Sequence, residues 1–289
     1  MTDRATRFST ILAGIDEWGA AHAAAAVVGP GGILAAQGDL ARRFPWASVT
    51  KLVTALTVLI AVERGVISLD EAAGPPGATI RHLLAHSSGL PFRGGAIVAP
   101  PGRRRIYSNS AFDALGTHVA ERAGRPFGAV LAEWVLEPLA MDGTTLVERP
   151  SDGLHGPLTD LAAFAREMLR PSLVEISTLA AAATVAFPGL AGVVPGVGRF
   201  DPCDWGLGFE LHDGKSAHWM GERSSPSTFG HFGGSGTFVW VDPDAQLGLA
   251  VLTDRAFGPW ALHAWPRFSD DVLSAARVLP GARQASSRR

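Results

Sequence analysis

The chain has 289 residues, of which 47% are hydrophobic and 18% charged, so it can bury a large core within one domain or two tightly joined ones. Its 25 basic and 27 acidic residues give a formal net charge of −2. The net charge is therefore too small and of the wrong sign to attract nucleic acid or an anionic membrane surface, and a small-molecule partner is expected.

The N-terminus favours a cytoplasmic protein. Asp3 and Arg4 precede a short apolar stretch, without the basic start, long apolar run and cleavage site of a secretory signal. No later segment reaches the roughly 18 uninterrupted apolar residues of a membrane helix. The single cysteine, Cys203, cannot form an internal disulfide and is compatible with a reducing compartment. The oligomeric state stays open.

The first third of the chain predicts a hairpin and a buried helix. Residues 21–28 and 33–37 are apolar strands joined by a glycine-rich turn. Residues 48–64 are apolar nearly all round, and Gly65 follows them as a favoured residue just past a helix end.

The rest of the chain predicts a helical middle and a return to strands. Helical patterns occupy residues 80–86, 110–123, 127–139 and 159–170; strands are expected at 206–211, 237–241 and 247–253, with a closing helix at 269–278. We expect one α+β domain over residues 1–289, with an antiparallel sheet built from both termini, flanked by helices, and an inserted helical region. The sheet-bearing part comprises about residues 10–65 and 200–280, and the helical part about residues 66–199. The cleft should lie between these parts.

Ser48 and Lys51 lie three residues apart at the start of the predicted helix, so their side chains share one face. The serine hydroxyl is also near the positive end of that helix. An amine can accept the serine proton only if its pKa is lowered, and burial beside Leu52 and Val53 would lower it. Taken alone, Ser-x-x-Lys is equally typical of an N-capping serine followed by a lysine that reaches solvent.

Tyr107 and Asn109 are the only tyrosine and the only asparagine of the chain, and they lie two residues apart. Lysine is almost as rare, at Lys51 and Lys215. In a chain whose composition avoids these residue types, the places that retain them are informative. The phenol could pass a proton in a cleft while the amide orients Lys51 or a substrate carbonyl. The alternative is a polar turn ahead of a helix.

The segment His231-Phe232-Gly233-Gly234 precedes the last predicted strands. Glycine at a strand start permits a substrate to approach the backbone closely, although it also has purely structural causes. The Gly234 N–H could face the Ser48 N–H across the cleft and donate to an oxyanion.

Three motifs occur in the order found in class C β-lactamases: Ser48-Val-Thr-Lys51, Tyr107-Ser-Asn109 and His231-Phe-Gly-Gly234. Over about residues 21–254 the sequence resembles that family, together with the related D-Ala-D-Ala carboxypeptidases and β-lactamase-like esterases. Connecting segments are similar too, among them Leu83-Leu-Ala-His-Ser-Ser-Gly-Leu-Pro91 and Trp205-Gly-Leu-Gly-Phe209.

The resemblance implies a β-lactamase/transpeptidase-like fold and a serine hydrolase that forms an acyl-enzyme on ester or amide substrates, including β-lactams. It implies that Ser48 attacks the carbonyl, that Lys51 and Tyr107 act as coupled base and acid, and that Asn109 orients. It further implies that the N–H groups of Ser48 and Gly234 form the oxyanion hole.

His231 lies where many relatives have a lysine or histidine that assists Tyr107 or holds a substrate carboxylate. With an ordinary pKa of about 6.5, His231 would be mostly neutral at cytosolic pH and would anchor a carboxylate weakly. Together with the short connection before Tyr107, this favours esterase activity on small neutral acyl groups. The alternatives are a cytosolic acyltransferase, a D-amino-acid peptidase of the same fold, or a non-catalytic ligand-binding homologue.

Two further clusters of titratable residues occur in the sequence. His82 and His86 lie four residues apart on a predicted helix, but no glutamate follows His82 as in zinc peptidases, so we expect no metal. No glycine-rich phosphate loop is present, so we expect no cofactor. Arg103, Arg104 and Arg105 would attract an anionic substrate or lie in a solvated loop.

Overall fold

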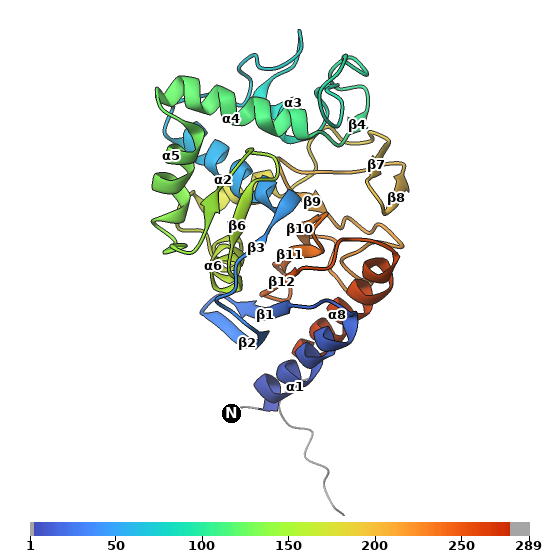
Figure 1. Ribbon diagram of the computed structural model, residues 1–289. Helices are drawn as coiled ribbons and strands as arrows, with labels where there is room; N and C mark the ends of the chain where they lie inside the picture. Colours follow the sequence, from blue (N-terminus) through green and yellow to red (C-terminus); the bar gives the residue numbers. More distant parts are fainter. Residues whose placement is uncertain (1–2, 278–289) are drawn as a thin grey trace, which may run out of the picture.

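A six-stranded antiparallel sheet forms the centre of the molecule, which the computed structural model describes over residues 3–277 (Figure 1). The N-terminal hairpin joins the C-terminal strands where Ala26 pairs with Ala250. The predicted α+β architecture, with its sheet built from both termini, is therefore confirmed. In spatial order the strands are β2 (Gly32–Gly38), β1 (Ala23–Gly29), β12 (Leu247–Thr253), β11 (Thr237–Asp242), β10 (Phe229–Gly233) and β9 (Glu210–Leu211).

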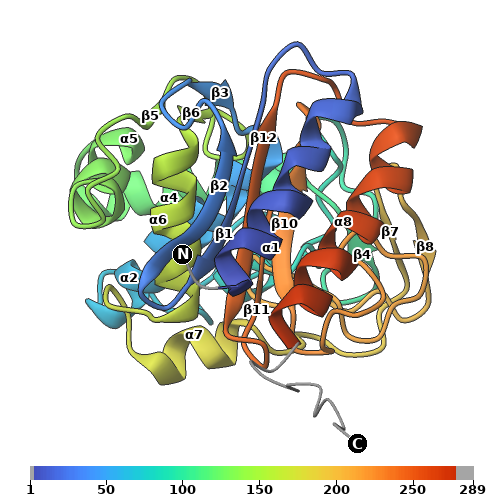
Figure 2. The same cartoon turned by 90° about the horizontal axis from the view of Figure 1, so that it is seen from below.

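Different helices bury the two faces of the sheet. Successive side chains of a strand point to opposite faces, so Ala26 of β1 joins the core under α6 (Leu158–Leu169), whereas Val27 joins the core under α1 (Asp3–Leu12) and α8 (Pro259–Arg277). Figure 2 shows α1 and α8 lying together across one face. Because both faces are covered, β1 and β12 are apolar throughout rather than alternating.

The helices α1 and α8 differ from the sequence prediction. The closing helix, expected at 269–278, begins at Pro259, a residue suited to a first helical turn because it lacks an N–H. Pro266 interrupts the helical pattern of the sequence, yet the helix continues through it because Trp265 and Phe268 pack in the core. Residue 278 lies outside the described residues. Helix α1 was not predicted; it buries Phe8 against the sheet.

The predicted helices of the middle region are confirmed, with shifts at their ends. The helix expected at 48–64 begins as a 3-10 turn, η2 (Ala47–Val49), continues as α2 (Thr50–Glu63) and stops before Gly65, whose φ is 68°. The helix expected at 127–139 divides into α5 (Phe127–Leu131) and a π-helical turn, η3 (Ala132–Leu136). The other predicted helices are α3 (Ile80–Leu84), α4 (Asn109–Ala123) and α6, whereas α7 (Ile176–Ala182) was not predicted.

Two small sheets carry the segments that lead into the candidate site. One contains β3 (Phe44–Pro45), β6 (Leu154–Gly156) and β5 (Thr145–Leu146); the other contains β4 (Arg105–Ile106), β7 (Gly192–Val194) and β8 (Gly198–Phe200). Strand β3 leads to the turn that carries Ser48, and β4 leads directly to Tyr107. The strand expected at 206–211 is reduced to β9. Within residues 3–277, no helix is both long enough and apolar enough to cross a membrane.

Candidate active site

Ser48 lies in the turn η2, between β3 and α2. Ala47 precedes it with a φ of 46°, a left-handed conformation that a non-glycine residue adopts only where its surroundings impose it. The turn is fastened to the large sheet, because the Thr237 hydroxyl donates to the Trp46 carbonyl at 3.0 Å and the Ser235 hydroxyl to the Pro45 carbonyl at 2.7 Å. Both hydroxyls come from the segment that follows β10.

Ser48 opens onto a cavity of about 270 Å³, here called the nucleophile cavity. Its lining comes both from the helical part and from strand β10 with the residue that follows it. Of the six site residues predicted from the sequence, four line this cavity and Lys51 contacts one of them, Ser48. Asn109 does not line it. The lining includes Ser48, Tyr107, Trp205, Glu210, His231 and Gly234.

Lys51 is fully buried one helical turn after Ser48. Its Nζ lies 3.2 Å from the Ser48 Oγ and donates to the Ser151 carbonyl at 2.9 Å. Burial lowers the pKa of Lys51 to about 7, against the charges of Asp152 and Asp113, which raise it. At neutral pH the amine is therefore partly unprotonated and can accept the proton of the Ser48 hydroxyl.

Tyr107 completes the group around the nucleophile. Its hydroxyl hydrogen-bonds Ser48, and the Lys51 Nζ lies 4.8 Å from the centre of its ring. Burial raises the pKa of Tyr107 well above its ordinary value, and the charge of Glu210 raises it further. The phenol is therefore protonated at neutral pH, which suits a proton donor rather than a primary base.

Asn109 lies next to a carboxylate at the start of a helix. It is the first residue of α4, and its amide nitrogen donates to the Asp152 carboxylate at 3.3 Å. Among the described residues no hydrogen bond joins Asn109 to Lys51. The buried Oδ1 of Asn109 has no hydrogen-bond partner among these residues, so the orientation of a substrate carbonyl by Asn109 stays a prediction. The carboxylate that Asn109 contacts is the one whose charge raises the Lys51 pKa.

The turn at Pro150–Asp152 was not identified from the sequence. Its carbonyls accept hydrogen bonds from two side chains of α2, Lys51 at Ser151 and Thr54 at Pro150. The charge of Asp152, the strongest on Lys51, also comes from this turn. A Pro-Ser-Asp-Gly sequence indicates only a turn, so tertiary contact alone reveals its place beside Lys51.

His231, on β10, is fully buried and its ring centre lies 5.6 Å from that of Tyr107. Its Nδ1 donates to the Phe232 carbonyl at 2.6 Å. Burial, together with the charge of Lys51, lowers the pKa of His231 to about 4. The ordinary pKa expected from the sequence is therefore wrong, and this histidine is neutral at pH 6 as well as at pH 8.

Glu210 is a buried carboxylate of the nucleophile cavity that sequence reasoning missed, although it directly follows the family-like segment ending at Phe209. Its Oε1 accepts from the His218 Nε2 at 2.8 Å, while within residues 3–277 its Oε2 has no hydrogen-bond partner. Burial alone would raise the pKa of Glu210, but the His218 hydrogen bond and nearby cations outweigh it, so the pKa is lowered. A negative charge is therefore held beside Tyr107.

Gly234 lines the nucleophile cavity together with Ser48, as the oxyanion-hole expectation requires. The preceding Gly233 packs against the nucleophile turn, where an added Cβ would lie 2.4 Å from the Trp46 carbonyl oxygen and 3.1 Å from the Ala47 Cβ. Glycine is thus required at 233 for the strand end to approach Ser48.

The remaining candidates lie outside this group. The His82 Nδ1 contacts the Thr79 hydroxyl at 2.9 Å, whereas the His86 Nδ1 accepts from the Ser108 N–H at 3.1 Å. His86 also packs against the Tyr107 ring, so its observed contacts are those of a positioning residue. The second rare lysine, Lys215, donates to two backbone carbonyls and is structural.

Comparison with known proteins places the chain in a family. The β-lactamase family profile matches residues 11–273. The crystal structure of a β-lactamase from Mycobacterium bovis is 51% identical, with a TM-score of 0.91, and the match covers 93% of this chain and 100% of that one. EstCE1, a hydrolase with promiscuous acyltransferase activity, shares the fold at 18% identity and a TM-score of 0.76, over 93% of this chain and 98% of that one.

A curated relative matches a shorter stretch. The D-alanyl-D-alanine-carboxypeptidase/endopeptidase AmpH of Escherichia coli strain K12 is 29% identical over 36% of this chain and 37% of that enzyme, so the match spans about a third of the relative. The profile match and the Mycobacterium bovis structure cover nearly the whole described chain. The protein belongs to the β-lactamase family, whose members are generally serine hydrolases, and it has the β-lactamase/transpeptidase-like fold.

Proposed function

We propose that this protein is a serine hydrolase that forms an acyl-enzyme at Ser48 on ester or amide substrates, with esters preferred. One observation carries the proposal: a fully buried lysine whose pKa is about 7 lies 3.2 Å from a serine hydroxyl on the wall of a cavity. Activation of a nucleophile by a base of lowered pKa is the arrangement that covalent catalysis requires.

Acylation follows from this geometry. Neutral Lys51 takes the Ser48 proton while the Oγ bonds to the substrate carbonyl carbon, and the N–H groups of Ser48 and Gly234 donate to the oxyanion. As the bond to the leaving oxygen or nitrogen breaks, Tyr107 gives that atom its proton and recovers one from Lys51. Water then attacks the acyl-enzyme by the reverse path, and the acid and Ser48 are released.

The nucleophile cavity favours small uncharged acyl groups. It encloses about 270 Å³ and presents mainly apolar side chains, with a neutral His231 in place of a cation. A bicyclic β-lactam needs its carboxylate held while water attacks from a defined direction. β-Lactams are nevertheless the competing substrate, since the 51% identical structure from Mycobacterium bovis is named a β-lactamase.

The nucleophile can be tested directly. A fluorophosphonate probe should label Ser48, and Ser48→Ala should abolish both labelling and ester turnover, because no other nucleophile is proposed. The exposed Ser227 provides a matched control, since Ser227→Ala should keep both. Labelling of the Ser48→Ala protein at another serine, located by peptide mapping, would refute the assignment.

The pH dependence tests the base. Lys51 must be neutral to accept the proton, so kcat/KM should rise with pH through an apparent pKa of about 7. Asp152 raises the Lys51 pKa and Arg93 lowers it. Asp152→Asn should therefore move this acid limb to lower pH, and Arg93→Gln should move it to higher pH. If the apparent pKa of the acid limb shifts in the same direction in both variants, or shifts in neither, the limb does not report the ionisation of Lys51.

Substrate preference tests the cavity. Short-chain aryl esters should be hydrolysed with higher kcat/KM than penicillins or cephalosporins, and the ratio should be the same at pH 6 and pH 8 because His231 is neutral at both. Parallel assays with one purified sample measure both ratios. If a cephalosporin is hydrolysed faster than every ester, β-lactamase is the better description. A gain for carboxylate substrates at pH 6 that is lost in His231→Gln would contradict the neutral histidine, since a gain caused by protonated Lys51 would remain in that variant.

A further inference from the structure

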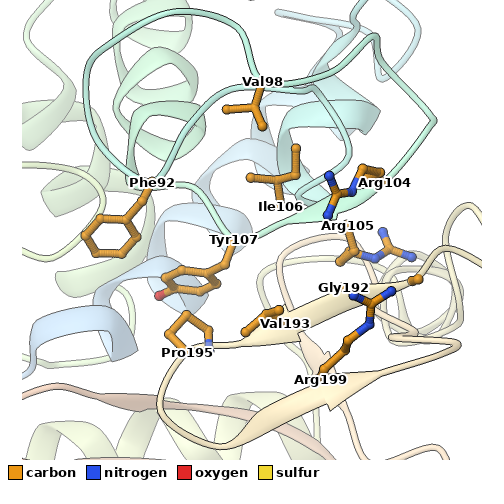
Figure 3. Close-up of a pocket in the computed structure, with 11 residues that line it drawn as sticks. Phe92, Val98, Arg104, Arg105, Ile106, Tyr107, Gly192, Val193, Pro195 and Arg199 are labelled. Atoms are coloured by element: carbon orange, nitrogen blue, oxygen red, sulfur yellow. The ribbon is translucent and has the colours of Figure 1, made fainter.

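A second and larger pocket adjoins the nucleophile cavity, with a volume of about 620 Å³ (Figure 3). We call it the arginine pocket, after two of the residues that line it. Phe92, Tyr107 and Pro195 line both spaces, so the phenol stands at their junction. Much of the remaining lining is apolar. The characteristic residues of the arginine pocket are Phe92, Val98, Arg104, Ile106, Val193 and Arg199.

The three-stranded sheet β4-β7-β8 builds the arginine-bearing wall. Arg105 of β4 pairs with Gly192 of β7, and Val193 of β7 pairs with Arg199 of β8, so Arg104 and Arg199 reach one pocket from distant parts of the sequence. Figure 3 shows both guanidinium groups on the side of the pocket away from Phe92. The arginine pocket therefore begins at Tyr107, is largely apolar, and carries positive charge on the side away from Phe92.

The predicted arginine run divides into different roles. Arg105 is buried, and its guanidinium donates to the backbone carbonyls of Cys203 at 3.0 Å and Ala186 at 2.8 Å. Arg104 and Arg199 are exposed, and across residues 3–277 neither guanidinium forms a hydrogen bond or ion pair with the protein. Their donors are free for a ligand, whereas those of Arg105 are occupied. Arg103 is exposed and does not line the pocket.

We propose that the leaving part of the substrate carries a carboxylate, joined by an apolar spacer, that binds Arg104 and Arg199. This inference rests on the proposed function. Tyr107 donates its proton to the leaving oxygen or nitrogen, so the leaving alcohol or amine continues from Tyr107 into the arginine pocket. The planar guanidinium matches a carboxylate, and the exposed apolar side chains Phe92, Val98 and Val193 cover the spacer. The small neutral acyl group stays beside His231.

Two pairs of synthetic esters test the assignment. The first pair places the charge on the leaving side: ω-acetoxyoctanoate and its neutral primary amide, with acetate release measured. The second places it on the acyl side: the mono-p-nitrophenyl ester of suberic acid and its neutral primary amide. We expect kcat/KM for ω-acetoxyoctanoate to exceed that for its amide about fivefold, the scale of two partly exposed charge pairs. The acyl-side pair should show no such preference.

The arginines are tested by substitution. The double variant Arg104→Gln/Arg199→Gln should lose the preference for ω-acetoxyoctanoate through a higher KM, with the neutral amide as the reference substrate in each protein. Arg103→Gln should keep it, and added salt should weaken it in the unmodified protein. Equal values for the two leaving-side esters, a preference on the acyl side instead, or an equal loss in Arg103→Gln would overturn the proposal.

Failure of the subsite is distinguishable from failure of the hydrolase. If no ester is hydrolysed in a Ser48-dependent manner, the proposed function falls, and binding of the leaving alcohol still tests the pocket. Calorimetry should then show tighter binding of ω-hydroxyoctanoate than of ω-hydroxyoctanamide, with the difference lost in Arg104→Gln/Arg199→Gln. Equal affinities would overturn the subsite, whether or not esters are hydrolysed.

Discussion

The candidate site depends on the burial of one amine, that of Lys51. The ordinary pKa of a lysine in water lies about three units above neutral pH, so the amine is protonated at neutral pH and cannot take a proton from serine. Helix α2 is buried along nearly its whole length, and this burial lowers the Lys51 pKa to about 7. Burial of a lysine normally lowers the free energy of unfolding, so this base makes the fold less stable than an apolar residue would. The hydrogen bond to the Ser151 carbonyl and the charge of Asp152 offset part of that loss.

Three separate parts of the chain converge on this amine. The turn at Pro150–Asp152 holds it from one side, and the segment after β10 fastens the strained turn that carries Ser48. Tyr107 arrives from the end of β4 and is packed by His86. Because these supports lie in different elements, Ser48, Lys51 and Tyr107 come together only when the helical part and the sheet are in contact.

The electrostatics of the cleft divide it into two unlike spaces. The part of the chain that the structure describes lines the nucleophile cavity with a neutral histidine, a protonated phenol and one carboxylate, Glu210, and with no fixed cation for a substrate acid. The adjoining pocket is apolar near Tyr107 and positive at Arg104 and Arg199. A substrate that spans both would place its uncharged and charged ends in the matching environments, with the scissile bond at the phenol.

Local sequence patterns determined much of this protein. Apolar runs and glycine placement predicted the hairpin β1–β2, the helices α2 to α6 and the strands β11 and β12, but not α7, β10 or the short strands β3 to β8. The rarity of lysine, tyrosine and asparagine marked Ser48, Lys51 and Tyr107 as a chemical group. Helix α1 and the start of α8 were not predicted from the sequence, because their apolar faces can be recognised only once the sheet that buries them is known. Tertiary structure decided the neutrality of His231, the partner of Asn109 and the place of Glu210, since each depends on burial and on neighbours far away in sequence. The different roles of Arg104 and Arg105 have the same cause: both line the arginine pocket, and only the fold determines that the guanidinium of Arg105 is bound to backbone carbonyls while that of Arg104 is exposed.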